Sequence, residues 1–194
     1  MLACRHETPD PSICTFLGVA LLAASVSAAA ADAWPELIEP GTIVLFRHAN
    51  APGVGDPTNF KLNDCTTQRN LDDRGRAEAC RLGERFRSRK IKVDAVLTSQ
   101  WCRGRETARL AFGDLATDEP AFNSFFSRSA GISDAQTAQA RAILSRWRGP
   151  GALVVVTHQV NITALTGGYA ASAEGVVLRP AADGSLKVLG RVTP

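Results

Sequence analysis

The hydrophobic positions of the chain form continuous runs at some places and helical spacings at others. Apolar or β-branched residues fill 42–46 and 153–156 without interruption, and polar or turn-forming residues follow each run. Such runs are typical of strands buried on both faces, as in the centre of a parallel sheet. The segment 93–97 is a third candidate strand.

Between these strands, apolar residues recur at three- and four-residue spacings, which predicts helices. We expect the first helix at 72–89, the second at 102–112, a third at 133–147 and a short one at 161–165. The segment 114–131 has no regular pattern and is predicted to be irregular.

The chain ends in two further candidate strands, 174–179 and 185–191, on either side of the turn signal Asp183-Gly184. The predicted order is strand–helix–strand–helix–helix–strand–helix, followed by this hairpin. Such alternation indicates an α/β fold, a three-layer α/β/α sandwich with a mostly parallel central sheet and an antiparallel edge.

The composition is that of one globular domain. The 194 residues are 45% hydrophobic and 21% charged, which argues against disorder. The net charge is +3, and no block of Lys or Arg occurs, so we expect no nucleic-acid partner.

The first thirty or so residues differ from the rest. Positions 16–31 are apolar or small, and Val26-Ser27-Ala28 fits the small-residue pattern of a signal peptidase site. We therefore expect a signal peptide at 1–31 and a mature domain at 32–194 that is periplasmic or secreted, without stable membrane insertion. A membrane-anchored or cytosolic protein is the alternative, because the cationic region before the apolar run is weak.

Export would leave three cysteines, Cys65, Cys80 and Cys102, and so at most one internal disulfide. If the loops after the first two strands meet at one sheet edge, Cys65–Cys102 is the plausible pair and Cys80 a packed thiol. Three unpaired cysteines are an equal alternative.

Two histidines remain outside the predicted signal peptide, and both follow a buried-strand candidate: Arg47-His48 after the first, and His158 after the run at 153–156. Ligands bind beyond the carboxyl ends of parallel strands, and the helix expected at 102–112 would bring Arg103 and its N-terminal N–H groups to the same edge. Two imidazoles with two guanidinium groups suit a dianionic oxyanion such as phosphate. One neutral imidazole can attack phosphorus while the second donates to oxygens that gain charge. This chemistry requires no metal.

Four segments resemble motifs of the histidine phosphatase superfamily, the phosphoglycerate mutase-like proteins. Arg47-His48-Ala49 is similar to the family's Arg-His-Gly, and Val156-Thr157-His158 to its late histidine. The segment 71–79 is similar to its Leu-Thr-x-x-Gly-x-x-Gln-Ala helix start, and 99–108 to the Arg and Thr-Ala of its second motif. Four motifs in the family's order make the resemblance specific.

The resemblance implies roles for individual residues. His48 would be the nucleophile that becomes phosphohistidine, Arg47 and Arg103 would bind the phosphoryl group, and His158 would stabilise the transition state. Arg69 is a further candidate for substrate binding, with a solvated loop cation as the alternative, and so is Asn50. Arg105 is expected to point away from Arg103, because two residues are about half a helical turn. The resemblance implies no metal and no cofactor.

Two positions depart from the family pattern. Ala49 replaces the motif's Gly, at a cost that depends on its backbone angle. Asn123 stands where many members carry a Glu that protonates the leaving group, and Asn cannot supply that proton. Asp118 or Glu119 could substitute, although their spacing favours neither.

These observations predict a phosphomonoester hydrolase with a phosphohistidine intermediate, acting on a small phosphorylated substrate of undetermined identity. The exported branch resembling the lipopolysaccharide core heptose phosphatase also lacks an obvious donor and has a Cys in its first loop, comparable to Cys65. A phosphohistidine phosphatase and a mutase are alternatives, and the mutase is disfavoured by the short segment 114–131. A phosphate-binding or interaction protein that keeps the pocket with little or no turnover is an alternative of another class, favoured by Asn123 and Ala49.

Overall fold

The computed structural model describes residues 32–126 and 130–194, so the predicted signal peptide lies outside the described residues. A mixed six-stranded sheet has the strand order β3-β2-β4-β1-β5-β6. Neighbours from β3 to β1 are parallel, and β5 and β6 are antiparallel additions. The strands are β1 (Ile43–Arg47), β2 (Val93–Thr98), β3 (Ala116–Asp118), β4 (Ala152–Thr157), β5 (Gly175–Pro180) and β6 (Leu186–Val192).

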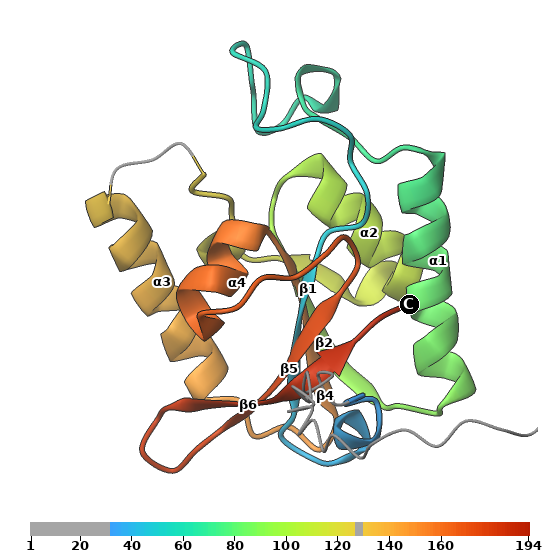
Figure 1. Ribbon diagram of the computed structural model, residues 1–194, viewed down its shortest axis with the longest axis vertical. Coiled ribbons are helices and arrows are strands. Elements are labelled where there is room, and N and C mark those ends of the chain that lie inside the picture. Colours follow the sequence, from blue (N-terminus) through green and yellow to red (C-terminus); the bar gives the residue numbers. More distant parts are fainter. Residues whose placement is uncertain (1–31, 127–129) are drawn as a thin grey trace, which may run out of the picture.

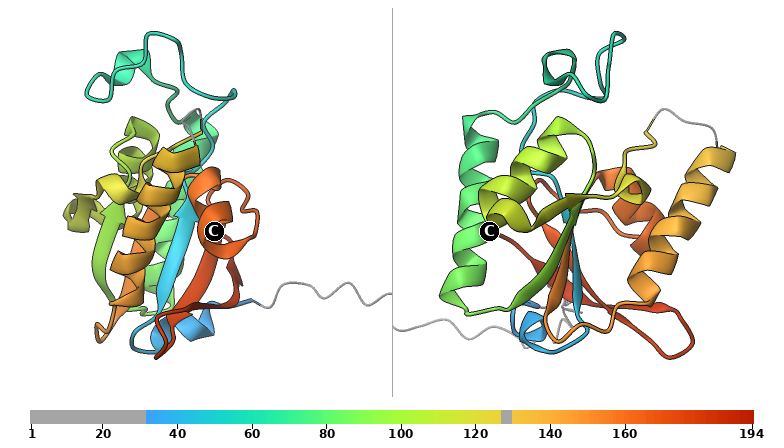
Figure 2. Two further views of the ribbon diagram at one scale, coloured as in Figure 1. Left: turned by 90° about the vertical axis from the view of Figure 1, so that its left-hand side faces the viewer. Right: turned by 180° about the vertical axis from the view of Figure 1, so that it is seen from behind.

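Helices cover both faces of this sheet, as Figures 1 and 2 show. The α-helices are α1 (Asp73–Ser88), α2 (Cys102–Phe112), α3 (Ala130–Ser145) and α4 (Gln159–Thr166). The described part of the chain also contains four short 3₁₀ helices: η1 (Pro35–Ile38), η2 (Cys65–Thr67), η3 (Gly113–Leu115) and η4 (Pro120–Phe122).

Alternate residues of the central strands supply two separate apolar cores. Val44 and Phe46 of β1 pack with residues of α1 and α2, whereas Ile43 and Leu45 pack with residues of α3 and α4. Since neighbouring side chains of a strand point to opposite faces, this double burial explains why β1 is apolar at its first four positions. The predicted three-layer α/β/α sandwich is confirmed.

The start of α1 is fixed against the loop that follows β1. Asp72 caps the helix by accepting a 2.7 Å hydrogen bond from the Gly75 N–H. A Cβ atom on Gly75 would lie 2.1 Å from the carbonyl oxygen of Asn50, so only glycine allows this approach. Glu78, buried one turn further on, accepts from the Asn50 N–H at 2.9 Å. The motif at 71–79 therefore joins α1 to the end of β1.

The structure differs from the predicted secondary structure at one strand and two helices. Strand β3 lies within the segment predicted to be irregular, because its three residues are held by pairing with β2 rather than by an apolar pattern. Helix α3 begins at Ala130 and ends at Ser145, where the next two N–H groups bond three residues back and close the last turn. Helix α4 begins directly after His158, whose carbonyl accepts its first intrahelical bond.

Cys65 and Cys102 form a disulfide, with Cα atoms 5.7 Å apart, so of the two predicted alternatives the pair is the one observed. The prediction of a packed Cys80 is wrong, because this residue is exposed on α1 and its thiol is free. Within 32–126 and 130–194, no helix is long and apolar enough to cross a membrane.

Candidate active site

The pairing of β1 with β4 brings the two histidines together. Arg47 is opposite Thr157 in the parallel register, so His48 and His158 follow at neighbouring strand ends. Their ring centroids lie 5.3 Å apart, and both residues are at most 3% exposed. The prediction that the topology places them at one sheet edge is confirmed.

A backbone carbonyl fixes the proton on His48. The Nδ1 atom lies 2.8 Å from the carbonyl oxygen of Ala49, which can only accept, so Nδ1 carries the hydrogen and Nε2 keeps its lone pair. Nε2 accepts from the Nε–H of Arg103 at 3.2 Å. Burial, and next the charge of Arg103, lower the pKa of His48 to about 3. The imidazole is therefore neutral at physiological pH, with its nucleophilic nitrogen towards the guanidinium groups.

Ala49 takes the place of the family's glycine without strain, since its φ is not positive. Its methyl group is fully buried against Ala51, Leu71, Ala79 and Ala173. The N–H of Ala49 donates to Thr107 Oγ1 at 3.1 Å, and that hydroxyl donates to the carbonyl of Arg103 at 2.7 Å. Thr107 thus joins the end of β1 to the first turn of α2.

His158 is held by Ser99, which follows β2. Ser99 Oγ lies 2.7 Å from His158 Nε2 and accepts the Trp101 N–H at 3.2 Å. The hydroxyl can donate to Nε2 or accept from it, and either bond holds the ring of His158 in place. Burial, followed by the charges of His48 and Arg103, lowers the pKa of His158 well below its usual value.

Arg103 is 2% exposed on the first turn of α2. A Cβ on Gly104 would lie 3.2 Å from the carbonyl oxygen of Ser99, so glycine lets α2 begin close to the end of β2. The two terminal nitrogens of Arg103 donate to both oxygens of Asp56, Nη1 to Oδ1 at 2.5 Å and Nη2 to Oδ2 at 3.1 Å. The buried cation is therefore paired in the fork geometry that Arg also uses for phosphate.

Arg47 and Arg69 add two further guanidinium groups beside that of Arg103. Arg47 Nη1 donates to Tyr169 Oη at 3.0 Å and to the carbonyl of Ala170 at 3.3 Å. Arg69 donates to three carbonyls of the loop after β1, at Ala51, Gly53 and Gly55. It is a half-buried loop anchor on the cavity wall rather than a solvated cation.

These residues surround a cavity of about 220 Å³, small beside the roughly 300–1,000 Å³ of pockets for drug-sized ligands. Three guanidinium groups and one carboxylate line it within the described part of the chain, giving a net charge of +2 while both histidines are neutral. Val54, Phe126 and Tyr169 form an exposed apolar rim, at 88%, 59% and 63% exposure. The cavity suits a small dianion attached to an apolar or ring-shaped group.

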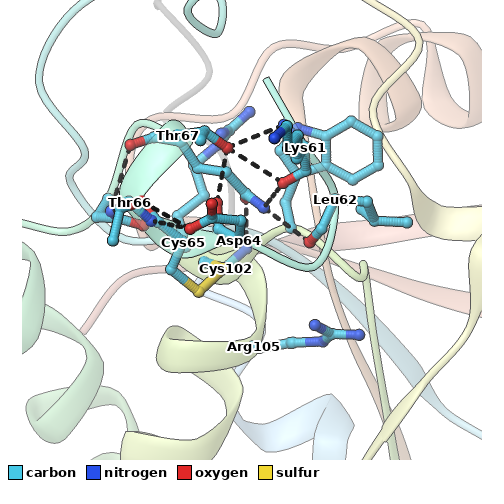
Figure 3. The surroundings of a disulfide bond; sticks show 12 residues. Lys61, Leu62, Asp64, Cys65, Thr66, Thr67, Cys102 and Arg105 are labelled. Carbon is cyan, nitrogen blue, oxygen red and sulfur yellow. Dashed lines mark hydrogen bonds between the residues drawn. A yellow bond between two sulfur atoms is a disulfide. The ribbon is translucent and has the colours of Figure 1, made fainter. Parts of the chain in front are cut away.

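The loop over the cavity is joined to α2 (Figure 3). The disulfide attaches Cys65 to the first residue of the helix, and Gln68 Oε1 accepts the Cys102 N–H at 2.9 Å. In the same turn, the N–H groups of Gly104 and Arg105 both donate to the carbonyl of Trp101. The expected use of these helix N–H groups for an anion is therefore wrong at these three positions, since protein atoms already accept from them.

Four other predicted residues lie apart from the cavity. Asn50 donates to Asp72 Oδ2 at 2.8 Å and does not line the cavity, so its predicted contact with substrate is not supported. Asn123 accepts from the Gln100 N–H at 2.8 Å and holds the turn after β2. The remaining two are candidate donors: Asp118 pairs with Arg105, which points away from Arg103 as predicted, and Glu119 caps η4.

Asp56 is the site residue that sequence reasoning missed. It belongs to no periodic pattern and to none of the four motifs. Its contacts are with Arg103 and Trp101, 47 and 45 residues further along the chain. The signal that could have found it is an acid between glycines and prolines in a long loop beside a site that lacks a proton donor.

A family model resembles part of this chain. A sequence model of the histidine phosphatase superfamily (branch 1) matches residues 43–124, which include His48 and Arg103 but not His158. No curated protein sequence matches the chain.

Solved structures share the fold. The protein histidine phosphatase SixA complexed with tungstate has a TM-score of 0.56 at 16% identity, covering 79% of this chain and 97% of its own. A mycobacterial glucosyl-3-phosphoglycerate phosphatase complexed with VO3 has a TM-score of 0.58 at 15% identity, covering 79% and 99%. Mycobacterial hydrolase 1 has a TM-score of 0.59 at 15% identity, covering 80% and 100%. The chain is therefore similar to the histidine phosphatase superfamily over residues 43–124 and shares the fold of these solved structures.

Proposed function

We propose that the protein is a phosphomonoester hydrolase that works through a phosphohistidine intermediate on His48. The observation that carries the proposal is the fixed tautomer of His48, whose unprotonated Nε2 accepts from the guanidinium of Arg103. A neutral imidazole with one nitrogen blocked by a carbonyl is an activated nucleophile, and the neighbouring cations suit the group it would attack.

The site residues divide the reaction between them. Arg103 and Arg47 bind phosphoryl oxygens, and the Nε2 lone pair of His48 forms a bond to phosphorus while the bond to the leaving oxygen breaks. His158 Nδ1–H donates to an oxygen that gains charge in the transition state. Water then attacks phosphorus, the P–N bond breaks, and its electron pair returns to Nε2.

A phosphohistidine phosphatase is a second candidate. The structural likeness to SixA supports it, as does the position of Asn123, which turns its amide to Gln100 instead of supplying a carboxyl group. An imidazole leaving group makes smaller demands on a proton donor than an alkoxide. The exposed rim of Val54, Phe126 and Tyr169 could contact a peptide or another apolar leaving group.

We infer that the protein acts outside the cytoplasm, in the periplasm or after secretion, as an exported member resembling the lipopolysaccharide core heptose phosphatase. The apolar segment at 16–31 supports this location, and the Cys65–Cys102 disulfide suits an oxidising compartment. N-terminal sequencing of protein from its native host tests the inference. A chain beginning near residue 32 is expected, and an intact Met1 would contradict export.

Activity is tested with 4-nitrophenyl phosphate, comparing the wild type with His48→Ala. Hydrolysis is expected only in the wild type, and rapid quenching under alkaline conditions should trap phosphate on His48.

Arg103→Lys and Arg105→Lys form a matched pair, since both arginines lie on α2 and bind an aspartate but only Arg103 lines the cavity. Arg103→Lys should weaken vanadate binding at least tenfold, and Arg105→Lys should leave it unchanged. Tight vanadate binding with no turnover of aryl phosphates or phosphohistidine peptides would indicate the phosphate-binding protein instead.

A further inference from the structure

One carboxylate, that of Asp56, lines the cavity within the described part of the chain. Both of its oxygens accept from Arg103, and Oδ2 also accepts from the indole N–H of Trp101 at 2.8 Å. Its side chain is 18% exposed, compared with 3% for that of Arg103. Asp56 thus faces the cavity from the side of the loop, whereas Arg103 forms part of its interior.

A phosphoryl group that reaches His48 must use the terminal nitrogens of Arg103 that Asp56 now occupies. The carboxyl group must then move from Arg103, while the hydrogen bond from Trp101 can keep it at the cavity wall. Gly53 and Gly55, both at positive φ, lie just before Asp56 in the loop. The carboxyl group would therefore remain beside the bound phosphoryl group, on the side of the open rim from which the leaving group projects.

We propose that Asp56 is the general acid and base of the reaction, protonating the leaving oxygen and then accepting a proton from the attacking water. The proposal rests on the proposed phosphatase function and assigns the proton donor that Asn123 cannot provide. It also gives the 50–70 loop a catalytic part, since this loop carries Asp56 to a site built by the strand ends.

The protons balance over both steps. In the first, His48 Nε2 bonds to phosphorus, the P–O bond to the leaving group breaks, and the Asp56 carboxyl proton goes to the leaving oxygen. Phosphohistidine, an alcohol and the Asp56 carboxylate result. In the second, water oxygen bonds to phosphorus, one water proton goes to Asp56, and the P–N bond breaks. Neutral His48, protonated Asp56 and the hydrogen phosphate dianion are produced, so the acid is regenerated.

Substrate binding itself would favour the protonated form of Asp56. Burial raises the pKa of Asp56, but the hydrogen bonds from Arg103 and Trp101 outweigh it and hold that pKa below its ordinary value in the free protein. When a dianionic phosphoryl group takes over Arg103, Asp56 loses its cation and gains a like charge, and both changes raise its pKa. The other titratable or charged groups on the cavity wall are Arg47 and His48 from the end of β1, Arg69 from the loop, His158 from the end of β4, and Tyr169 from the segment after α4.

The test compares two substrates that both carry an aromatic ring but differ in the basicity of the leaving oxygen. 4-Nitrophenyl phosphate releases a stable phenolate and needs little protonation, whereas benzyl phosphate releases an alkoxide and needs a proton. Asp56→Asn should lower kcat/KM, which reports on phosphohistidine formation, by about a hundredfold to ten-thousandfold for benzyl phosphate and by less than about tenfold for 4-nitrophenyl phosphate. Hydrolysis of the phosphohistidine, which the two substrates share, should slow equally for both. Because both substrates suit the apolar rim, the difference reports on proton transfer.

Asp118→Asn is the matched control, because it removes an Asp–Arg pair that lies outside the cavity. It should leave both rates unchanged. Wild-type kcat/KM for benzyl phosphate should fall relative to that for 4-nitrophenyl phosphate as the pH rises through the pKa of the acid that protonates the leaving oxygen. This measurement needs no variant and decides the matter even if Asp56→Asn fails to fold.

Equal losses of kcat/KM on both substrates would overturn the proposal and leave Asp56 as a residue that only positions Arg103. Tighter phosphate binding by Asp56→Asn with an unchanged rate ratio would also overturn it, leaving Asp56 as a competitor for Arg103. If the wild type hydrolyses neither substrate nor a phosphohistidine peptide, the proposed phosphatase function itself fails. If the wild type hydrolyses both esters and the ratio of the two rates does not change with pH, the proposed role of Asp56 is refuted, whereas the proposed phosphatase function stands.

Discussion

The hydroxyl oxygen of Ser99 lies 2.7 Å from Nε2 of His158, and the two residues follow the neighbouring strands β2 and β4. The Trp101 N–H donates to the same hydroxyl, which can donate to the ring or accept from it. A serine at this place therefore holds the Nε2 edge of His158, although Ser99 itself does not line the cavity.

Replacing Ser99 with Ala should lower kcat by about tenfold to a hundredfold, the equivalent of one lost hydrogen bond to a buried group. KM should change little, because the interaction acts through the transition state. Steady-state kinetics on 4-nitrophenyl phosphate measures both constants. Ser88→Ala, at an exposed hydroxyl that bonds only to its own helix, is the control. A rise in KM at constant kcat would show that Ser99 serves ground-state binding instead.

The disulfide should stabilise the fold and keep the loop over the cavity. It closes a segment of 37 residues between Cys65 and Cys102, for which the chain-entropy relation gives about 4 kcal/mol. Reduction of the wild type, or Cys65→Ser with Cys102→Ser, should therefore lower the free energy of unfolding in urea by a few kcal/mol. Vanadate affinity should fall as well, because the loop also carries Arg69.

Cys80→Ser is the control for the disulfide, since the Cys80 thiol is free and exposed. This variant should unfold at the wild-type urea concentration and respond to reductant as the wild type does. A reduced protein with unchanged stability and unchanged vanadate affinity would show that Gln68 and Arg69 hold the loop without the covalent link.

Sequence patterns predicted the parts of the site that lie at strand ends. Apolar runs located β1 and β4, parallel pairing put His48 beside His158, and helical spacing placed Arg103 at the start of α2. These predictions succeeded because burial within a central sheet leaves a strong local signal.

Positions set by contacts between distant segments were not predictable in this way. Asp56 is placed by Arg103 and Trp101, and neither partner leaves a mark on the residues around Asp56. Asn50 has the right place in the loop, but Asp72 and Glu78 hold it, and their capture of Asn50 depends on how α1 packs. Strand β3 is short and exposed, so pairing with β2 defines it and no periodicity does.

Gly75 tests the junction between α1 and the loop after β1. Gly75→Ala places a methyl group 2.1 Å from the Asn50 carbonyl oxygen and should lower the free energy of unfolding by about 1–3 kcal/mol. Gly131→Ala in α3 is the matched control, because its Cβ would meet no atom within 4 Å, and it should stabilise the helix by up to about 1 kcal/mol. Urea unfolding measures both, and a Gly75→Ala protein as stable as the wild type would contradict this packing.

Burial of a neutral His48 should make the folded protein sensitive to acid. Its pKa falls from 6.5 to about 3 on folding, so between these values the unfolded chain binds more protons than the folded one. The free energy of unfolding is then at its full value above pH 6.5 and falls as the pH is lowered, by up to about 1.4 kcal/mol per pH unit from this group. His158 acts in the same direction, since its pKa is also lowered.

His48→Gln should therefore lose less stability than the wild type between about pH 7 and pH 4 in urea unfolding experiments. Carboxylates contribute equally to both proteins, so the difference between the two curves isolates His48, and parallel curves would show that this imidazole takes up its proton in the folded state at its ordinary pKa.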